Sequence, residues 1–273
     1  MVTISVDKKL CTGDGKCVDV CPINILKMND DRVPEFVTGG ADTCIKCGHC
    51  FSVCPHGAIT LESANPKDAL ILDPSKLPAA GQVKLFLKGR RSVRRYTDEP
   101  LDAALINELL DIARYAPSGI NRQPVSWAVL QGTEKVHELT RLVIQWIDEL
   151  LAAKSDIASA YRFSRLSETW KQGKDLICRG APCLVTAYGV KDDPMVPPSC
   201  TIAATYLELA AFGLGLGACW AGYVQMAANM DERVKKFMGI PARAAVGAVM
   251  MVGHPKHQYM RIPPRNPAKV IWK

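Results

Sequence analysis

Beyond residue 100, hydrophobic positions follow helical spacing in some stretches and strand-like spacing in others. Residues 101–116 and the stripe from Val136 to Leu150 have helical periodicity, which predicts two helices capped near Asp102 and Thr133. Residues 201–214 are rich in alanine and predict a third helix. Shorter apolar runs predict strands at residues 125–130, 184–188 and 244–252. This alternation predicts an α+β fold for the larger part of the chain.

Two further stretches have less regular patterns. Residues 154–180 are polar and mostly helical in composition, which makes them a candidate cover for a site. Residues 209–228 are apolar enough to raise the question of a membrane span. However, Glu208 flanks this stretch, and glycines interrupt it in the sequence G-L-G-L-G, which favours a helix end followed by a buried strand. The same glycines follow a helical run and lack the spacing of a dinucleotide-binding fingerprint.

Seven of the eleven cysteines lie within the first 54 residues and fall into two runs. The second run, from Cys44 to Pro55, has the spacing C-x2-C-x2-C-x3-C-P, which is typical of a bacterial ferredoxin cluster site. The first run, from Cys11 to Pro22, has the same length and the same ending, but Asp14 stands at its second ligand position. The two runs together indicate a protein that transfers electrons.

In such paired sites, the fourth cysteine of each run binds the other cluster. The predicted ligands of one cluster are Cys11, Asp14, Cys17 and Cys54, and those of the other are Cys44, Cys47, Cys50 and Cys21. A carboxylate is a harder ligand than a thiolate and holds iron less firmly. The Asp14 site is therefore expected to contain either a four-iron cluster with one oxygen ligand or a three-iron cluster. The other site is expected to contain a four-iron cluster.

Residues 1–65 resemble the two-cluster ferredoxin domain of bacteria, with one departure at Asp14. Hydrophobic residues are few there, so the clusters are expected to hold the small domain together. Zinc sites and disulfides also use closely spaced cysteines, but zinc rarely needs seven of them.

The first ten residues lack the apolar segment of a secretory signal, which predicts a cytoplasmic protein. Two polar, proline-bearing patches predict a linker over residues 66–84, followed by a second domain at residues 85–273.

Charge is distributed unevenly between the two parts. Residues 1–65 hold six Lys and Arg against eight Asp and Glu, a net charge of −2, whereas the remainder carries +9, for a total of +7. No long basic run interleaved with aromatic residues is present, which argues against a nucleic-acid partner. The basic balance suits an anionic cofactor or a docking face for an acidic electron carrier. Outside the two runs, four cysteines are expected to be buried structural thiols: Cys178, Cys183, Cys200 and Cys219.

A second group of motifs begins at residue 90. The sequence R-R-S-V-R at residues 90–94 places three arginines and a serine together, a composition that suits phosphate binding. It is followed by A-P-S-G-I-N-R-Q-P at residues 116–124, G-L-G-A-C-W-A-G at 215–222 and P-P-R-N-P at 263–267. In this order and spacing, residues from about 85 to the C-terminus resemble the FMN-dependent nitroreductase family.

The resemblance implies a mixed sheet with helices and two FMN sites at the interface of a homodimer. Four residues match positions that bind the phosphate, ribityl chain and pyrimidine edge: Arg90, Arg91, Ser92 and Arg94. Five match a loop that reaches the flavin, often from the partner subunit: Pro117, Ser118, Gly119, Asn121 and Gln123. Ala221 and Gly222 match backbone positions near the reactive edge of the flavin, and Arg265 matches a C-terminal phosphate contact. No side chain stands out as a general acid or base, as expected where the flavin carries the chemistry.

These observations predict an iron–sulfur flavoprotein oxidoreductase with two clusters and FMN. Electrons from an external carrier or NAD(P)H would pass through the clusters to FMN and then to a small acceptor, such as a nitroaromatic, a quinone or an activated alkene. The reverse direction is equally compatible with the sequence. The alternatives are a non-catalytic electron-transfer module and a flavin-modifying or dehalogenating enzyme on the same fold. A nucleic-acid-binding iron–sulfur protein is the least favoured. Neither a membrane nor a nucleic acid is expected as a partner.

Overall fold

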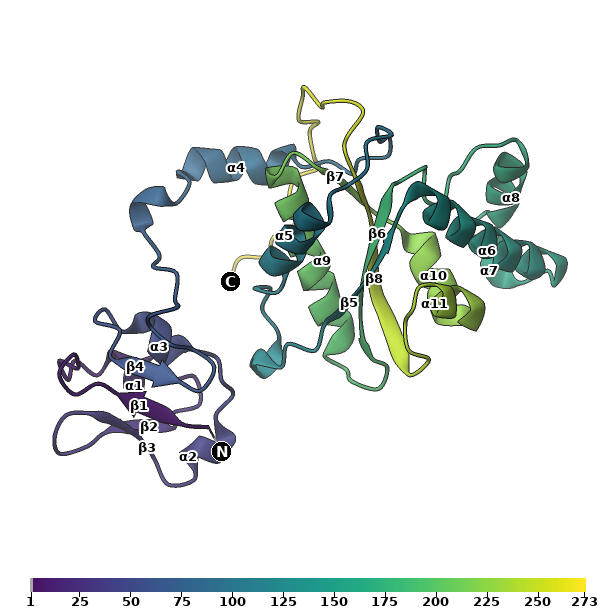
Figure 1. Ribbon diagram of the computed structural model, residues 1–273. Coiled ribbons are helices and arrows are strands. Elements are labelled where there is room, and N and C mark those ends of the chain that lie inside the picture. The colour runs from purple at the N-terminus through teal and green to yellow at the C-terminus, as the bar shows by residue number, and fades with distance from the viewer. Residues whose placement is uncertain (1) are drawn as a thin grey trace. The chain divides into compact units, whose positions relative to one another are not determined.

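The computed structural model describes residues 2–273, which divide into two compact units. The first unit comprises the residues up to Leu77 together with Ile120–Arg122, and the second comprises Pro78–Gly119 with Gln123–Lys273. Helix α4 begins at Ala80, within the stretch that the sequence predicts as a linker. Each unit has its own sheets and its own core (Figure 1).

The first unit is built from two small sheets of two strands each and three short helices. Strand β1 pairs antiparallel with β4, and β2 pairs antiparallel with β3. The elements of this unit are β1 (Ile4–Val6), α1 (Lys16–Asp19), β2 (Leu26–Met28), β3 (Pro34–Phe36), α2 (Gly40–Thr43), α3 (His49–Val53), β4 (Ile59–Leu61) and the 3-10 turn Pro74–Lys76. Helices α1 and α3 each begin inside one of the two cysteine runs, so the runs have the same local architecture.

Little apolar surface is buried in the first unit. Its two cores each contain three buried residues: Cys17, Ile59 and Leu61 in one, and Cys21, Ile25 and Leu26 in the other. Two of these six are predicted cluster ligands. A domain of this size buries too little surface to be stable by hydrophobic burial alone. The expectation that bound clusters supply part of its stability is therefore compatible with the structure.

The second unit is a three-layer arrangement of helices around one sheet. Its strands lie in the order β5-β6-β8-β7, and every pair is antiparallel. The strands are β5 (Ser126–Gln131), β6 (Cys183–Val190), β7 (Gly217–Trp220) and β8 (Ala244–Gly253). The helices are α4 (Ala80–Gly89), α5 (Ala103–Ala113), α6 (Thr133–Ala152), α7 (Asp156–Ala160), α8 (Phe163–Lys171), α9 (Val196–Gly213), α10 (Gly222–Met230) and α11 (Glu232–Phe237), with a 3-10 turn at Gly119–Asn121.

The two faces of this sheet pack against different helices. Leu184 and Met251 join a core with α6, α8, α10 and α11, whereas their neighbours Val185 and Met250 join a core with α5 and α9. Figure 1 shows these two helix groups on opposite sides of the strands. A central strand buried on both faces has a continuous apolar sequence, because alternate side chains enter opposite cores. Gly247 on β8 permits one close approach, since a Cβ there would collide with Cys200 of α9.

The structure confirms the α+β class and most of the predicted elements. Asp102 caps α5, where its side chain accepts a hydrogen bond from the backbone N–H of Ala104. Thr133 is the first helical residue of α6 and not its cap, a position that Gly132 takes. The implied mixed sheet is also corrected, because within residues 2–273 every strand pair of the four-stranded sheet is antiparallel. The long helical connections that join these strands can return the chain in either direction.

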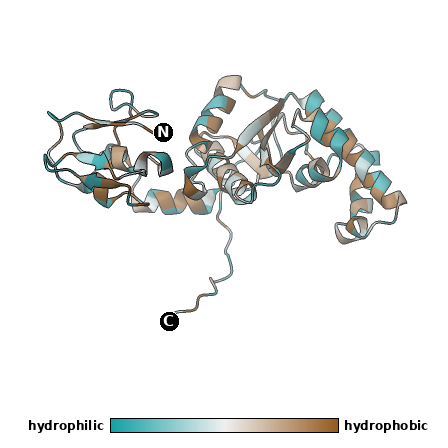
Figure 2. Ribbon diagram, turned by 90° about the horizontal axis from the view of Figure 1, so that it is seen from below, coloured by the Kyte–Doolittle hydropathy of each residue, from teal (hydrophilic) through white to brown (hydrophobic). Residues whose placement is uncertain are grey.

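The apolar stretch at residues 209–228 contains the end of α9, strand β7 and the start of α10. This arrangement agrees with the predicted helix end and buried strand. Among residues 2–273, no helix combines the length and the apolar composition needed to cross a bilayer. Figure 2 shows hydrophobic residues concentrated along the strands, and a C-terminal segment that extends from the second unit without regular secondary structure.

Candidate functional sites

The cysteines of the first unit line two cavities. One is lined by Cys44, Cys47, Cys50 and Cys21, together with apolar neighbours that include Ile4, Leu26 and Phe36. The other is lined by Cys11, Asp14, Cys17 and Cys54, with Met28, Pro34 and His56 nearby. Each cavity is thus lined by three ligand positions of one run and by the last cysteine of the other run, while the crossed assignment of ligands stays a prediction. Cysteine sulfurs beside apolar neighbours are the ligand type that iron–sulfur clusters use. Among residues 2–273, however, no three Cys, His, Asp or Glu side chains stand close enough together to hold a metal ion as they are placed.

The two loops that carry the first three ligands have the same backbone conformation. Residue 13 and residue 46 both have positive φ, and Gly15 and Gly48 both have φ near +74°, at 75° and 73°. Each of these two glycines immediately precedes a short helix, α1 or α3. Glycine adopts this left-handed conformation without steric cost. Because the conformations match, Asp14 occupies the same place in its loop as Cys47 does in the other.

The carboxylate of Asp14 has two polar contacts, both with Lys16. One oxygen, Oδ1, accepts a hydrogen bond of 3.2 Å from the Lys16 backbone N–H, and Oδ2 lies 3.0 Å from Lys16 Nζ. These contacts hold the pKa of Asp14 below its usual value, and the hydrogen bond to Lys16 is the largest cause. Asp14 is therefore a carboxylate at neutral pH, which is the form that can bind iron.

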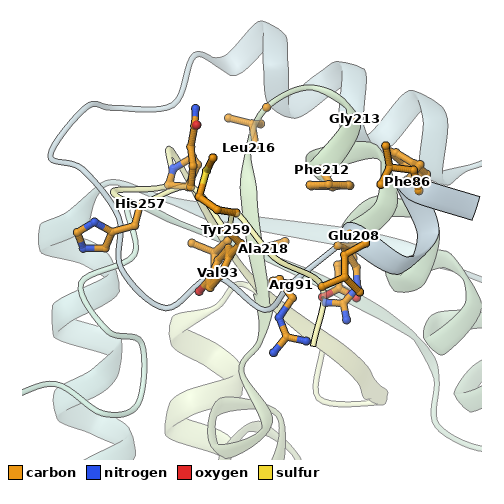
Figure 3. Close-up of a pocket in the computed structure, with 18 of the residues that line it drawn as sticks. Phe86, Arg91, Val93, Glu208, Phe212, Gly213, Leu216, Ala218, His257 and Tyr259 are labelled. Atoms are coloured by element: carbon orange, nitrogen blue, oxygen red, sulfur yellow. The ribbon is translucent and has the colours of Figure 1, made fainter. Parts of the chain in front are cut away.

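A large pocket in the second unit lies among α4, α9 and the segment that follows β8. Its volume is about 690 Å³. Phe86 and Phe212, whose ring centroids are 5.3 Å apart, form part of an apolar wall, together with Leu85, Val93 and Leu216. Figure 3 shows Arg91 and Glu208 near each other at one end of this pocket, with His257 on the opposite side. A volume within the range of about 300–1,000 Å³, with mostly apolar walls and a few charged groups, is typical of a cofactor or small-molecule site.

Two predicted flavin-binding arginines, Arg90 and Arg91, line this pocket, and Arg261 adds a third guanidinium. Arg90 Nη1 donates to Glu208 Oε1 at 2.8 Å. Arg261 and Glu208 were not identified from the sequence. The sequence signal for Arg261 is only its position four residues before Arg265. The signal for Glu208 is only an acidic side chain among mostly apolar neighbours in a helix.

The remaining predicted flavin residues lie elsewhere in the chain. Ser92 and Arg94 flank Val93, whose backbone N–H bonds to Ala218 O at 2.9 Å, but neither lines the large pocket. Ala221 is buried at the start of α10, and its backbone N–H donates to Val249 O at 2.8 Å. Gly222 begins the same helix. Arg265 lies in the exposed C-terminal segment.

The loop at residues 117–123 does not line the large pocket. Pro117, Ser118 and Gln123 line a separate, smaller cavity of about 110 Å³, and Gln123 N–H donates to Ser118 Oγ at 2.9 Å. Gly119 packs closely against Met195, because a Cβ there would lie 2.8 Å from its sulfur. Asn121 groups with the first unit, where its Nδ2 donates to the carbonyl of Lys46 at 3.0 Å. Within a single chain, therefore, none of the residues 117–123 lines the Arg90 pocket.

The polar sequence of residues 154–180 predicts a cover for a site. They contain α7 and α8, and Phe163 packs in the core with Trp146 of α6 at a centroid distance of 5.5 Å. No residue of this stretch lines the large pocket. Sequence polarity alone could not indicate which side of the sheet the two helices cover.

The four cysteines outside the two runs are buried and free, as predicted. Burial raises the pKa of the Cys178 and Cys183 thiols to about 12 and that of Cys200 to about 11. Burial also raises the pKa of Cys219. All four thiols are therefore protonated near neutral pH, and reactivity depends on the thiolate.

The fold and the cavities define a class of protein, a redox protein in which an iron–sulfur unit is joined to an α+β unit with a cofactor-sized pocket. The model of the nitroreductase family matches residues 87–254, and that of the 4Fe-4S dicluster domain matches residues 9–58. Because the first match spans more than half of the chain, this protein belongs to the nitroreductase family and carries an N-terminal 4Fe-4S ferredoxin domain. The resemblances predicted from the sequence are confirmed, and the chain is an oxidoreductase.

Relatives cover each part of the chain separately. An NADH dehydrogenase from Thermus thermophilus is 26% identical over 62% of this chain and 84% of its own length. A ferredoxin from Methanocaldococcus jannaschii is 35% identical over 24% of this chain and 86% of its own length. Among solved structures, a nitroreductase from Bacteroides fragilis with bound FMN is 23% identical, with a TM-score of 0.59 over 70% of this chain and 97% of that one. The last of these comparisons supports the fold of the second unit.

Proposed function

We propose that this protein is an FMN-dependent oxidoreductase that passes electrons through two iron–sulfur clusters to FMN and on to a small acceptor. Nitroaromatics, quinones and activated alkenes are the candidate acceptors. The observation that carries this proposal is the presence, in one chain, of two cysteine-lined cavities and an arginine-edged apolar pocket. A built-in cluster domain would be redundant if NAD(P)H simply delivered hydride to the flavin, so a one-electron carrier is the favoured donor.

The eight residues of the two cavities would hold the clusters. Cys44, Cys47, Cys50 and Cys21 would bind a four-iron cluster through thiolates alone. Cys11, Cys17 and Cys54 would bind the second cluster with Asp14, whose equivalence to Cys47 in the loop supports a role as ligand. Its carboxylate would form the weakest of these bonds to iron.

The pocket of the second unit fits the two chemically distinct parts of FMN. Its apolar wall, which includes Phe86, Phe212 and Leu216, would exclude water from the ring, and Arg90 and Arg91 would bind the phosphate. Ser92, Arg94 and Arg265, which do not line this pocket, would provide the further polar contacts that the family resemblance implies. When bound, FMN supplies electron transfer that can proceed singly or in pairs, so no catalytic acid or base is required of the chain.

The proposal includes a homodimer. Pro117, Ser118 and Gln123 do not line the Arg90 pocket of their own chain, although the family resemblance assigns both to one flavin site. A partner subunit that contributes its own Pro117, Ser118 and Gln123 would complete the site. The backbone of Ala221 and Gly222 would then lie near the reactive edge. We place the protein in the cytoplasm, since its cysteines serve clusters and buried thiols, not disulfides.

The proposal is tested by cofactor analysis followed by turnover under anaerobic conditions. We expect protein purified without oxygen to contain FMN and cluster iron, and to oxidise a reduced ferredoxin when a nitroaromatic, a quinone or an activated alkene is supplied. Oxidation of the carrier by a second redox protein, without reduction of any small acceptor, would instead support a non-catalytic electron-transfer module. Reductive release of halide from a halogenated aromatic would support a dehalogenating enzyme. Protein that retains no FMN would contradict the proposal.

A further inference from the structure

Glu208 is the one acidic side chain that lines the large pocket of the second unit, across the described residues. It lies on α9, a helix whose other buried residues are mostly Ala, Leu, Val and Cys, and its side chain is only 9% exposed. A carboxylate in such surroundings must be paired, because burial of an unpaired charge costs several kcal/mol. Its partner is Arg90, at 2.8 Å. A negative charge placed beside residues expected to bind a phosphate requires an explanation.

The contact between Glu208 and Arg90 uses only part of the arginine. One hydrogen bond joins Arg90 Nη1 to Glu208 Oε1. A guanidinium has five N–H donors in a rigid planar fork, so the remaining donors stay available to a ligand. Arg90 is also partly open to the pocket, with 24% of its side chain exposed. Both side chains line the cavity, and the contact between them leaves part of the Arg90 guanidinium free to reach a ligand there.

A second contact fixes the same two segments. Phe86 and Arg90 lie four residues apart at the end of α4, and Glu208 and Phe212 lie four residues apart on α9, so each pair occupies one face of its helix. Phe86 packs on Phe212 while Arg90 pairs with Glu208, which means that the two segments run in opposite directions along this contact. Helix α4 has no buried residue, so these two contacts are important in setting where Arg90 stands.

We propose that Glu208 is a positioning residue that orients the Arg90 guanidinium toward the phosphate of the bound flavin. This inference rests on the proposed FMN function. Glu208 itself does not bind the phosphate, which it would repel. It restricts Arg90 to one orientation before the ligand arrives, so less side-chain entropy is lost on binding.

The inference is tested by comparing FMN with riboflavin, which has the same ring but no phosphate. Quenching of flavin fluorescence is measured on the full-length chain with its clusters, after removal of its flavin. We expect Glu208→Gln, which keeps a neutral hydrogen bond to Arg90, to raise the Kd for FMN about threefold, and Glu208→Leu to raise it about tenfold. The Kd for riboflavin is expected to change by less than about twofold in both. Glu138→Gln, on the exposed face of α6, is the matched control and should change neither.

A double-mutant cycle separates positioning from a merely structural role. Arg90→Ala should weaken FMN but not riboflavin, and adding Glu208→Leu to Arg90→Ala should cause no further loss. Thermal melting of each variant checks folding. If Glu208→Gln does not fold, Glu208→Leu gives the decisive result, because leucine suits the apolar face of α9.

Three results would overturn the inference: unchanged or tighter FMN binding in the Glu208 variants, equal weakening of FMN and riboflavin, or a loss that persists in the Arg90→Ala background. Wild-type protein that binds neither flavin would instead contradict the proposed function. Failure of the inference about Glu208 and failure of the proposed FMN function are therefore distinguishable in one set of titrations.

Discussion

The two units of this protein reach stability by different means. The first has two cores of three buried residues each, and its helices and strands are each only three to five residues long. The second has two extended cores on either face of a four-stranded sheet. From this comparison we expect the first unit to depend on its clusters for folding, and the second to fold through hydrophobic burial alone.

The units also differ in how far apart their site residues lie in the sequence. Each cluster cavity is lined by residues from two short runs, so ligand spacing is visible directly in the chain. The large pocket brings together residues 82–93, 208–218 and 255–262, and more than a hundred positions separate the first of these segments from the second. A local motif can reveal the first kind of site, but only the fold reveals the second.

The largest effect is expected from removing one cluster ligand. Cys47→Ala should abolish one cluster, unfold the first unit and leave the melting transition of the second unit in place, because only the first has cores as small as three buried residues each. Iron analysis and thermal melting followed by circular dichroism provide the measurement. Cys183→Ala, a matched substitution in the core of the second unit, should retain all iron. Retention of a folded first unit by metal-free Cys47→Ala would show that the two units do not differ in this way.

A substitution in the core of the second unit should destabilise that unit and leave the clusters of the first unit in place. Phe163 is fully buried and contacts Trp146 and Tyr223, so Phe163→Ala is expected to lower the free energy of unfolding of this unit by about 3–5 kcal/mol. The visible absorption of the clusters should be unchanged. Tyr161→Ala, at a neighbouring side chain that is half exposed, should cost much less. Denaturant unfolding monitored by tryptophan fluorescence measures both. Equal losses in the two variants would contradict the assignment of Phe163 to the core.

The two cluster sites should differ in how firmly they retain iron, and this effect should be smaller than the two effects above. Asp14→Cys would replace the weakest ligand by a thiolate at the position equivalent to Cys47. We expect the variant to retain roughly one more iron per chain than wild type after mild oxidation. Electron paramagnetic resonance should detect a three-iron cluster in oxidised wild type and not in Asp14→Cys. The same spectrum from both proteins would exclude Asp14 from the iron site.

The smallest expected effect concerns a surface ion pair of the second unit. Arg233 contacts Asp231 and Glu149, each at 2.6 Å, and lowers the pKa of both carboxyl groups. A folded-state pKa below the unfolded value stabilises the protein above the unfolded pKa, and this stabilisation is lost as pH falls through the folded pKa. Arg233→Gln should therefore slightly lower the Tm at pH 7, with a difference from wild type that shrinks as pH falls through the lowered pKa values of the two carboxyl groups. Lys236→Gln, on the same helix, controls for the change in charge. A difference in Tm that persists in acid would contradict this explanation.

The sequence was informative wherever structure depends on neighbouring residues. The cysteine runs, the cap at Asp102 and the long stripe of α6 follow from spacing and local hydrogen bonding, and they appear in the structure as predicted. The orientation of the strands, the face covered by residues 154–180 and the partner of Arg90 could not be predicted, because each depends on contacts between distant segments. Glu208 illustrates this limit, since nothing near it in the sequence indicates an arginine 118 positions away.

The central claim is that electrons reach the flavin through the clusters. It is tested most directly by following the bleaching of flavin absorbance without oxygen, after adding reduced ferredoxin, NADH or NADPH in separate experiments. The account predicts rapid bleaching by reduced ferredoxin alone, and its loss when Cys47 and Cys50 are both replaced by serine. Rapid bleaching by NADH or NADPH that survives these replacements would contradict the claim and indicate a hydride-fed nitroreductase with an accessory cluster domain.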